Sequence, residues 1–264
     1  MRQLWNTGPH APRLSEFRVT QSKQEDGSFD GLRSQIGPSG APGAAPTANA
    51  NNPYHRAAGV YERSLTLPII SAIRRQEARA VSDLIARYAD PSHRAIEIGP
   101  GTGFYTLDLA RRFREVVAVE DSASMADILR GKLAAAGARN VTVITQNFLA
   151  MKTDAPFDVA VAIGVLDYVS EPVAFVTRMC ETARRAVIFT TPRRGLLGWC
   201  FVAANKFRGT NVYCYDQSAL AQWAPDWHCT AEEVGMRTPL TRGLTLVASF
   251  ERRGAVRLPG SQRS

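Results

Sequence analysis

The amino-acid sequence predicts an α/β fold with a doubly wound, mostly parallel sheet. Two observations support this prediction. Short apolar, β-branched segments alternate with amphipathic helical segments along most of the chain, and the first apolar segment runs directly into a glycine-rich turn. Strands that are apolar on both faces are typical of parallel sheets buried between helices. Such sheets bind their ligands beyond the carboxyl ends of the strands.

Three regions are expected along the chain. Residues 1–52 lack hydrophobic periodicity and end in a run of Gly, Pro, Ala and Asn, which cannot bury enough apolar surface to offset its ordering entropy. We expect a disordered extension over residues 1–52, one domain over 53–250 and a basic tail over 251–264.

The elements of the domain follow in order. An amphipathic helix is predicted over residues 59–88, with Pro68 at its start or at a kink. Apolar strands are predicted at residues 95–98, 116–120, 141–145, 157–163 and 186–190. Helices are predicted between them at residues 106–113, 124–136 and 172–184. Beyond a basic and aromatic insertion at residues 193–215, Asp216 is expected to cap a helix, and residues 243–251 are expected to close the sheet in an antiparallel hairpin.

The charge and composition restrict the classes of partner and compartment. The formal net charge is +8, but the two tails supply half of it, so the charge is poor evidence for a nucleic-acid partner. The longest apolar runs are much shorter than the roughly 18–20 residues of a membrane span, and no apolar leader opens the chain. The four cysteines lack zinc-like spacing and are expected to be free thiols. We therefore expect a cytoplasmic protein without a metal site.

The turn after the first strand indicates what the protein binds. Its glycines are Gly99, Gly101 and Gly103, whereas the dinucleotide fingerprint would require a glycine where Phe104 stands. Glu97 precedes the turn by two residues and would repel a pyrophosphate, but it suits a ligand with an ammonium group. Glu120 stands 21 residues after Gly99, at the end of the second strand, where it suits a ribose diol.

The segments EIGPGTG and VVAVEDS resemble, as a pair, motif I and the following acidic strand end of class I S-adenosylmethionine-dependent methyltransferases. The resemblance extends over roughly residues 55–250. It implies a seven-stranded, mostly parallel, Rossmann-like sheet with a C-terminal antiparallel hairpin and a lid or insertion. It also implies S-adenosylmethionine as the cofactor of a small-molecule methyltransferase. The cofactor contacts that it implies are Glu97, Gly99, Gly101, Gly103, Glu120, Asn147, Phe148, Gly164 and Tyr61.

Some of these positions depart from the family pattern or have a second interpretation. Asn147 replaces the acid expected to contact adenine, although its amide oxygen can accept the same hydrogen bond. Phe148 is expected either against the adenine ring or in the core. Tyr54, His55 and Tyr61 resemble residues of an N-terminal lid that closes over the cofactor, and they could equally be ordinary packing side chains.

The acceptor side is expected to involve Asp167 and Tyr168, which follow the fourth strand, and Trp199 and Tyr213 of the insertion. Asp167 and His55 are the candidate catalytic bases, and His228 is interpreted as structural. The insertion carries cations and aromatic rings but no acid, which suits an aromatic or amphiphilic acceptor with an acidic group. The same residues could instead form a secondary core under a surface helix, or a lid that touches a membrane.

Two alternative functions remain open at the level of sequence. The opening motif also resembles that of rRNA adenine dimethylases, but those enzymes carry N-[LI]-P-[YF] after the fourth strand, and this chain has IGVLDY there. A non-catalytic S-adenosylmethionine-binding protein would keep the same cofactor residues. We expect a small-molecule acceptor, no stable nucleic-acid partner and no transmembrane segment, with peripheral membrane contact possible. The oligomeric state is not predicted.

Overall fold

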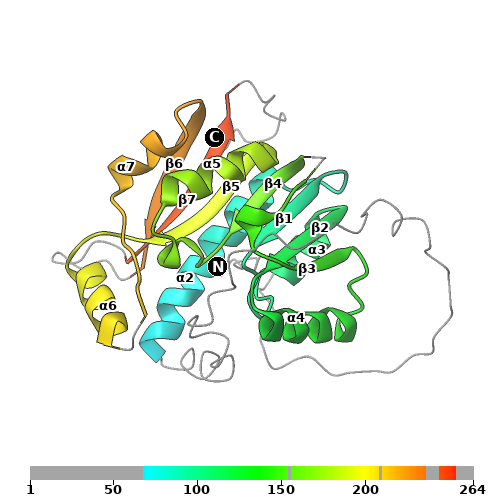
Figure 1. Cartoon of the computed structure of the whole chain (residues 1–264), viewed down its shortest axis with the longest axis horizontal. Coiled ribbons are helices and arrows are strands. Elements are labelled where there is room, and N and C mark those ends of the chain that lie inside the picture. Colours follow the sequence, from blue (N-terminus) through cyan, green and yellow to red (C-terminus); the bar gives the residue numbers. More distant parts are fainter. Residues whose placement is uncertain (1–67, 154–155, 208–209, 236–243, 254–264) are drawn as a thin grey trace, which may run out of the picture. The chain divides into compact units, whose positions relative to one another are not determined.

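The sheet contains seven strands among the residues that the structure describes, in the order β3-β2-β1-β4-β5-β7-β6 (Figure 1). The structure is a computed structural model that describes residues 68–153, 156–207, 210–235 and 244–253. The strands are β1 (Arg94–Ile98), β2 (Glu115–Glu120), β3 (Val141–Thr145), β4 (Phe157–Ala162), β5 (Ala183–Pro192), β6 (Trp227–Val234) and β7 (Thr245–Arg252). β1 to β5 pair in parallel, and β7 is antiparallel to both β5 and β6. This arrangement confirms the predicted mostly parallel, seven-stranded sheet with its antiparallel C-terminal hairpin.

The chain divides into two compact units, residues 1–45 and residues 46–264, and the described residues all belong to the second. The predicted N-terminal extension, the lid candidates Tyr54, His55 and Tyr61, and nearly all of the basic tail lie outside the described residues.

Helices cover both faces of the sheet. They are α2 (Pro68–Tyr88), α3 (Thr106–Arg112), α4 (Ala123–Ala135), α5 (Pro172–Thr182), α6 (Leu196–Phe207) and α7 (Gln217–Trp223), with two short 3₁₀ helices, η2 (Phe148–Ala150) and η3 (Leu166–Tyr168). One buried cluster packs α5 and α7 on the sheet, and a second packs α2 and α3 on its other face. The alternating pattern of the sequence therefore predicts the layers correctly.

Three features differ from the predictions: one helix end, one strand and one helix cap. The helix expected to reach residue 184 ends at Thr182, because Ala183 already pairs with Phe157 of β4. β6 was not predicted, since its sequence WHCTAEEV mixes polar and apolar residues on an outer strand. Asp216 stands at the N-cap of α7 as expected, but its side chain makes an ion pair with Arg194 at 3.2 Å in place of a capping bond.

The strand order reverses at β1, which lies between β2 and β4. At such a point the loops that follow two neighbouring strands diverge to opposite faces and leave a crevice beyond their carboxyl ends. The glycine turn after β1, the acidic end of β2 and the segment after β4 all meet at this edge of the sheet. The fold therefore gathers the predicted site residues where ligands of doubly wound sheets bind.

Candidate functional site

The three glycines after β1 all adopt left-handed backbone conformations, with φ of +63° at Gly99, +58° at Gly101 and +84° at Gly103. A Cβ at Gly99 would lie 2.6 Å from Cγ2 of Val165, and one at Gly103 would lie 2.3 Å from Cδ1 of Leu129. A Cβ at Gly101 would meet no atom within 4 Å. The outer glycines are therefore required for close packing, whereas Gly101 faces open space beyond the sheet edge.

Glu120 fixes the turn to the end of β2. Its Oε2 accepts a hydrogen bond from the Gly101 N–H at 2.8 Å, and its Oε1 accepts one from the Ser122 N–H at 2.9 Å. Burial raises the pKa of Glu120, and the two backbone donors oppose that rise. Each carboxylate oxygen has a further lone pair, so Glu120 can still accept hydrogen bonds from a ligand.

Glu97 is a buried acid in the middle of the parallel sheet. Its residue is 3% exposed, and among the described residues its Oε2 has no hydrogen-bond partner. Burial raises the pKa of Glu97 to about 7; the nearby Thr106 hydroxyl opposes the rise and the charge of Glu120 adds to it. A buried carboxylate without a partner is costly, and a cation beside it would remove that cost.

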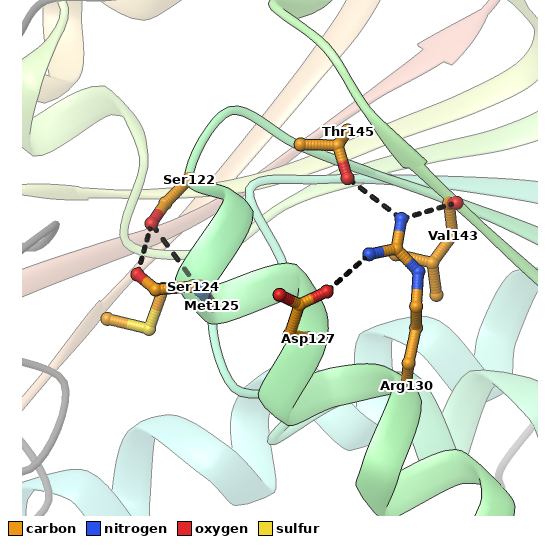
Figure 2. A network of polar contacts seen from close by, with 7 residues as sticks. All are labelled: Ser122, Ser124, Met125, Asp127, Arg130, Val143 and Thr145. Atoms are coloured by element: carbon orange, nitrogen blue, oxygen red, sulfur yellow. Dashed lines mark hydrogen bonds and ion pairs between the residues drawn. The ribbon is translucent and has the colours of Figure 1, made fainter.

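A polar network holds α4 against the end of β3 (Figure 2). Ser122 Oγ accepts a hydrogen bond from the Met125 N–H at 3.4 Å and caps α4. Arg130 makes an ion pair with Asp127 at 2.8 Å, and its Nη2 donates to Thr145 Oγ1 at 2.8 Å and to the Val143 carbonyl at 3.3 Å. The sequence did not single out Arg130, because an arginine three residues after an aspartate indicates only a local ion pair.

The segment after β3 carries the two predicted adenine contacts. Asn147 Oδ1 accepts a hydrogen bond from the Leu149 N–H at 2.9 Å and caps η2. Phe148 is buried in the core and packs edge-to-face on Phe175, with 5.4 Å between ring centroids. Of the two interpretations of Phe148, the structure therefore shows the core position, and the adenine contacts of both residues stay predictions.

The segment after β4 carries the predicted cofactor contact Gly164 and the predicted acceptor-side residues Asp167 and Tyr168. Gly164, with φ of +71°, donates its N–H to Thr190 Oγ1 at 2.8 Å, and a Cβ there would meet no atom within 4 Å. Asp167 and Tyr168 lie in η3, and the Asp167 carbonyl accepts the Tyr213 N–H at 2.8 Å. Residues 210–215 of the insertion therefore run beside η3.

The surroundings of Asp167 are partly buried. Burial is the main cause that raises the pKa of Cys214 to about 11 and that of Tyr215 to about 12, and the charge of Asp167 adds to both. The Tyr215 hydroxyl donates to the Val169 carbonyl. Asp167 thus lies near Cys214 and Tyr215, two partly buried side chains.

Two other predicted residues, Trp199 and His228, lie outside η3 and residues 210–215. Trp199 is on α6 and is 70% exposed. His228 is exposed on β6 and pairs in register with Glu251, whose other neighbour is Ala186 at the beginning of β5. That register places His228 toward the amino end of β5, away from the crevice.

Comparison with known proteins gives one match to a domain model and two partial matches to individual proteins. Residues 95–186 match the model of a methyltransferase domain. The chain is 42% identical over 86 residues to the mitochondrial ribosomal RNA small subunit methyltransferase of Arabidopsis thaliana, over 31% of this chain and 22% of that protein. It is 39% identical over 57 residues to protein-L-isoaspartate O-methyltransferase 2 of Rhodopseudomonas palustris (strain HaA2), over 22% of this chain and 26% of that protein. The matches thus span about a quarter of the length of each relative.

The fold has similar solved structures. One is magnesium protoporphyrin IX methyltransferase from Synechocystis PCC 6803 with bound SAH, which superposes with a TM-score of 0.61 over 76% of this chain and 97% of that chain, at 17% identity. At this identity the likeness shows the fold alone. Residues 95–186 are therefore a methyltransferase domain, and the strand order of the sheet is that of the class I S-adenosylmethionine-dependent methyltransferase fold.

Proposed function

We propose that this protein binds S-adenosylmethionine in the crevice beyond β1 and transfers its methyl group to a small-molecule acceptor. The observation that carries the proposal is Glu97, a buried carboxylate with an oxygen that has no partner among the described residues. S-adenosylmethionine carries an ammonium group, which supplies the cation that this carboxylate lacks.

The residues present fit the rest of the cofactor. The lone pairs left on Glu120 can accept hydrogen bonds from a ribose diol. The open space at Gly101 allows a ligand to approach the backbone of the turn. The bound cofactor supplies an already activated methyl group, so the protein contributes mainly positioning and exclusion of water. A base is required only if the acceptor must lose a proton.

The acceptor is proposed to bind in the crevice beside three residues, Asp167, Tyr168 and Tyr213. Asp167 is the proposed base, because it lies after β4 at the same edge of the sheet as the glycine turn. The tyrosines offer aromatic surface with polar edges, which favours an aromatic or amphiphilic acceptor.

Two cations that suggested an acidic group on the acceptor have partners. Arg193 makes an ion pair with Glu233 at 2.8 Å, and Arg194 makes one with Asp216 at 3.2 Å. Within the described part of the insertion this leaves Lys206, which is exposed. An acidic acceptor group would therefore bind either Lys206 or an arginine that exchanges partners.

A nucleic-acid acceptor is the second candidate, favoured by the local identity to a ribosomal RNA methyltransferase. The segment IGVLDY after β4 argues against it, because it lacks the aromatic N-[LI]-P-[YF] pattern that holds a flipped adenine. Radiolabelled S-adenosylmethionine offered with aromatic and amphiphilic acceptors, and separately with RNA, distinguishes the two. Label transferred to RNA alone would overturn the small-molecule proposal, and cofactor binding without transfer to any acceptor would indicate a non-catalytic protein.

The ligand-free protein should lose stability as the pH rises, through Glu97. Its folded pKa of about 7 exceeds the unfolded value of 4.5, so the folded state keeps a proton that the unfolded state releases between these pH values. The contribution of Glu97 is therefore present at low pH and is lost as the pH rises through 7, by roughly 3 kcal/mol in total. Urea unfolding of the wild type and of Glu97→Gln should diverge with pH, the variant being the more stable above pH 7. A pH-independent difference would contradict this assignment.

Cofactor affinity should have the opposite pH dependence. Because the ammonium group binds the ionised form of Glu97, affinity should rise by up to about tenfold per pH unit below pH 7 and then level off. In Glu97→Gln it should be weaker and nearly constant with pH. Calorimetric titration with S-adenosylmethionine and S-adenosylhomocysteine measures both, with NAD as the control ligand. Equal affinity of the two proteins at neutral pH would refute the proposed role of Glu97.

Gly101→Asn should weaken cofactor binding by at least about tenfold while the fold persists, since asparagine tolerates positive φ and its side chain would enter the space reserved for the ligand. Gly137→Asn is a matched control: Gly137 has φ of +64°, a Cβ there would also meet no atom within 4 Å, and it lies just beyond α4. Both variants should lose about 1 kcal/mol of stability or less. Equal cofactor affinity of the two variants would place the pocket elsewhere.

Asp167→Asn should lower the rate of methyl transfer by about 100-fold if the acceptor must lose a proton, and leave cofactor affinity unchanged. The substitution keeps the backbone carbonyl that accepts the Tyr213 N–H. Glu171→Gln, which neutralises an exposed carboxylate four residues later, is the control and should change neither quantity. Initial rates with the acceptor identified in the screen test this; equal rates in all three proteins would remove Asp167 from the site.

A further inference from the structure

One side of α6 presents large apolar groups to solvent. Leu196 is 69% exposed and Trp199 is 70% exposed, and their spacing of three residues puts them on the same side of the helix. Ala203 lies a further four residues on, and Cys200 beside them is also exposed. An exposed tryptophan and leucine on one side of a helix form an apolar patch of the kind that marks a binding surface for a protein or a membrane.

The opposite side of α6 is fixed to the protein. A Cβ at Gly198 would lie 2.2 Å from the Arg193 carbonyl oxygen, so the helix backbone packs directly on the chain at that point. The Cys214 thiol donates to the Gly198 carbonyl at 3.6 Å. Arg193 also forms a β-bridge with Tyr215 just before the helix. The outward orientation of Leu196 and Trp199 is therefore set by packing on the other side.

The helix also lies at the edge of the sheet that carries the site. α6 follows the carboxyl end of β5, and Figure 1 shows it standing off from the sheet (yellow) at that end of the strand. The segment that follows it, residues 210–215, returns to η3 through the hydrogen bond between Tyr213 and Asp167. A surface that bound the outer side of α6 would thus face the acceptor side of the crevice.

The charges around the apolar side of α6 indicate what kind of surface it would bind. The sequence contains no acid from Ala186 to Tyr215, and Lys206 stands at the end of the helix. Arg193 and Arg194 stand before it; Arg193 pairs with Glu233, whereas Arg194 pairs with Asp216 but keeps a side chain that is 68% exposed. Arg194 and Lys206 are exposed. Tryptophan and leucine flanked by cations are typical of helices that lie in the interface of an anionic bilayer.

We infer that α6 docks on an anionic lipid surface and directs the crevice toward it. The contact is peripheral: none of the helices in the described ranges is long and apolar enough to cross a membrane, and the 12 residues of α6 extend only about 18 Å. The inference rests on the proposed function in one respect, namely that the acceptor would be an amphiphile taken from the lipid surface.

Cosedimentation of the full-length protein with lipid vesicles tests the inference. Vesicles of phosphatidylcholine with about one third phosphatidylglycerol should bind the protein, and pure phosphatidylcholine vesicles should bind it much more weakly. Trp199→Ser and Leu196→Ser should each lower binding by about tenfold. Lys206→Gln should lower it by about fivefold. Val173→Ser, at a residue that is 51% exposed on α5, is the matched control and should bind as the wild type does.

Two outcomes would overturn the inference. One is vesicle binding that Trp199→Ser and Leu196→Ser do not reduce relative to Val173→Ser. The other is a wild-type dimer in sedimentation equilibrium that Trp199→Ser converts to a monomer without any vesicle binding, which would assign this side of α6 to a second copy of the chain. Calorimetric titration of the wild type and the same variants with S-adenosylmethionine tests the proposed function separately. A wild-type protein that does not bind S-adenosylmethionine would refute the proposed function, whereas the inference about lipid is judged from vesicle binding alone.

Discussion

The site depends on one electrostatic constraint, the burial of the Glu97 carboxylate inside a parallel sheet. Its neighbours in register are Ala118 of β2 and Val161 of β4, so neither of these residues offers it a counter-charge. Burial raises the pKa of Glu97 to about 7, which favours the neutral form of this acid. In the proposed function the ammonium group of the cofactor takes the place of that proton, and this exchange would link cofactor binding to pH.

The glycine turn next to this acid combines close packing with open space for a ligand. Its outer glycines allow contact with Val165 and Leu129, which come from the loop after β4 and from α4. Its middle glycine leaves the ligand side open and donates its N–H to Glu120. The same turn thus packs two distant segments together and keeps the crevice free. In sequence the three glycines look equivalent, because the side chains that distinguish them lie far along the chain.

Local patterns predict the sheet and its helices well, since apolar strands and amphipathic helices show their periods within a few residues. They fail where non-local contacts decide. β6 forms because β7 pairs along its whole length, although its own sequence mixes polar and apolar residues. Arg193 suggested a cation for an acidic acceptor, but Glu233, 40 residues away, is its partner. The role of Arg130 depends likewise on Thr145 across the packing of α4 on β3.

The cofactor side and the acceptor side of the crevice are built differently, and this difference bears on specificity. The cofactor side consists of strand ends and the turns directly attached to them, within the methyltransferase-domain match at residues 95–186. The proposed acceptor side adds residues 210–215 and α6, which lie beyond that match. α6 packs through Gly198 against the chain before it, and the Cys214 thiol donates to the Gly198 carbonyl. Neither of these contacts involves Glu97 or the glycine turn. We therefore propose that residues 193–207 and 210–215, which lie beyond the domain match, contribute to the choice of acceptor.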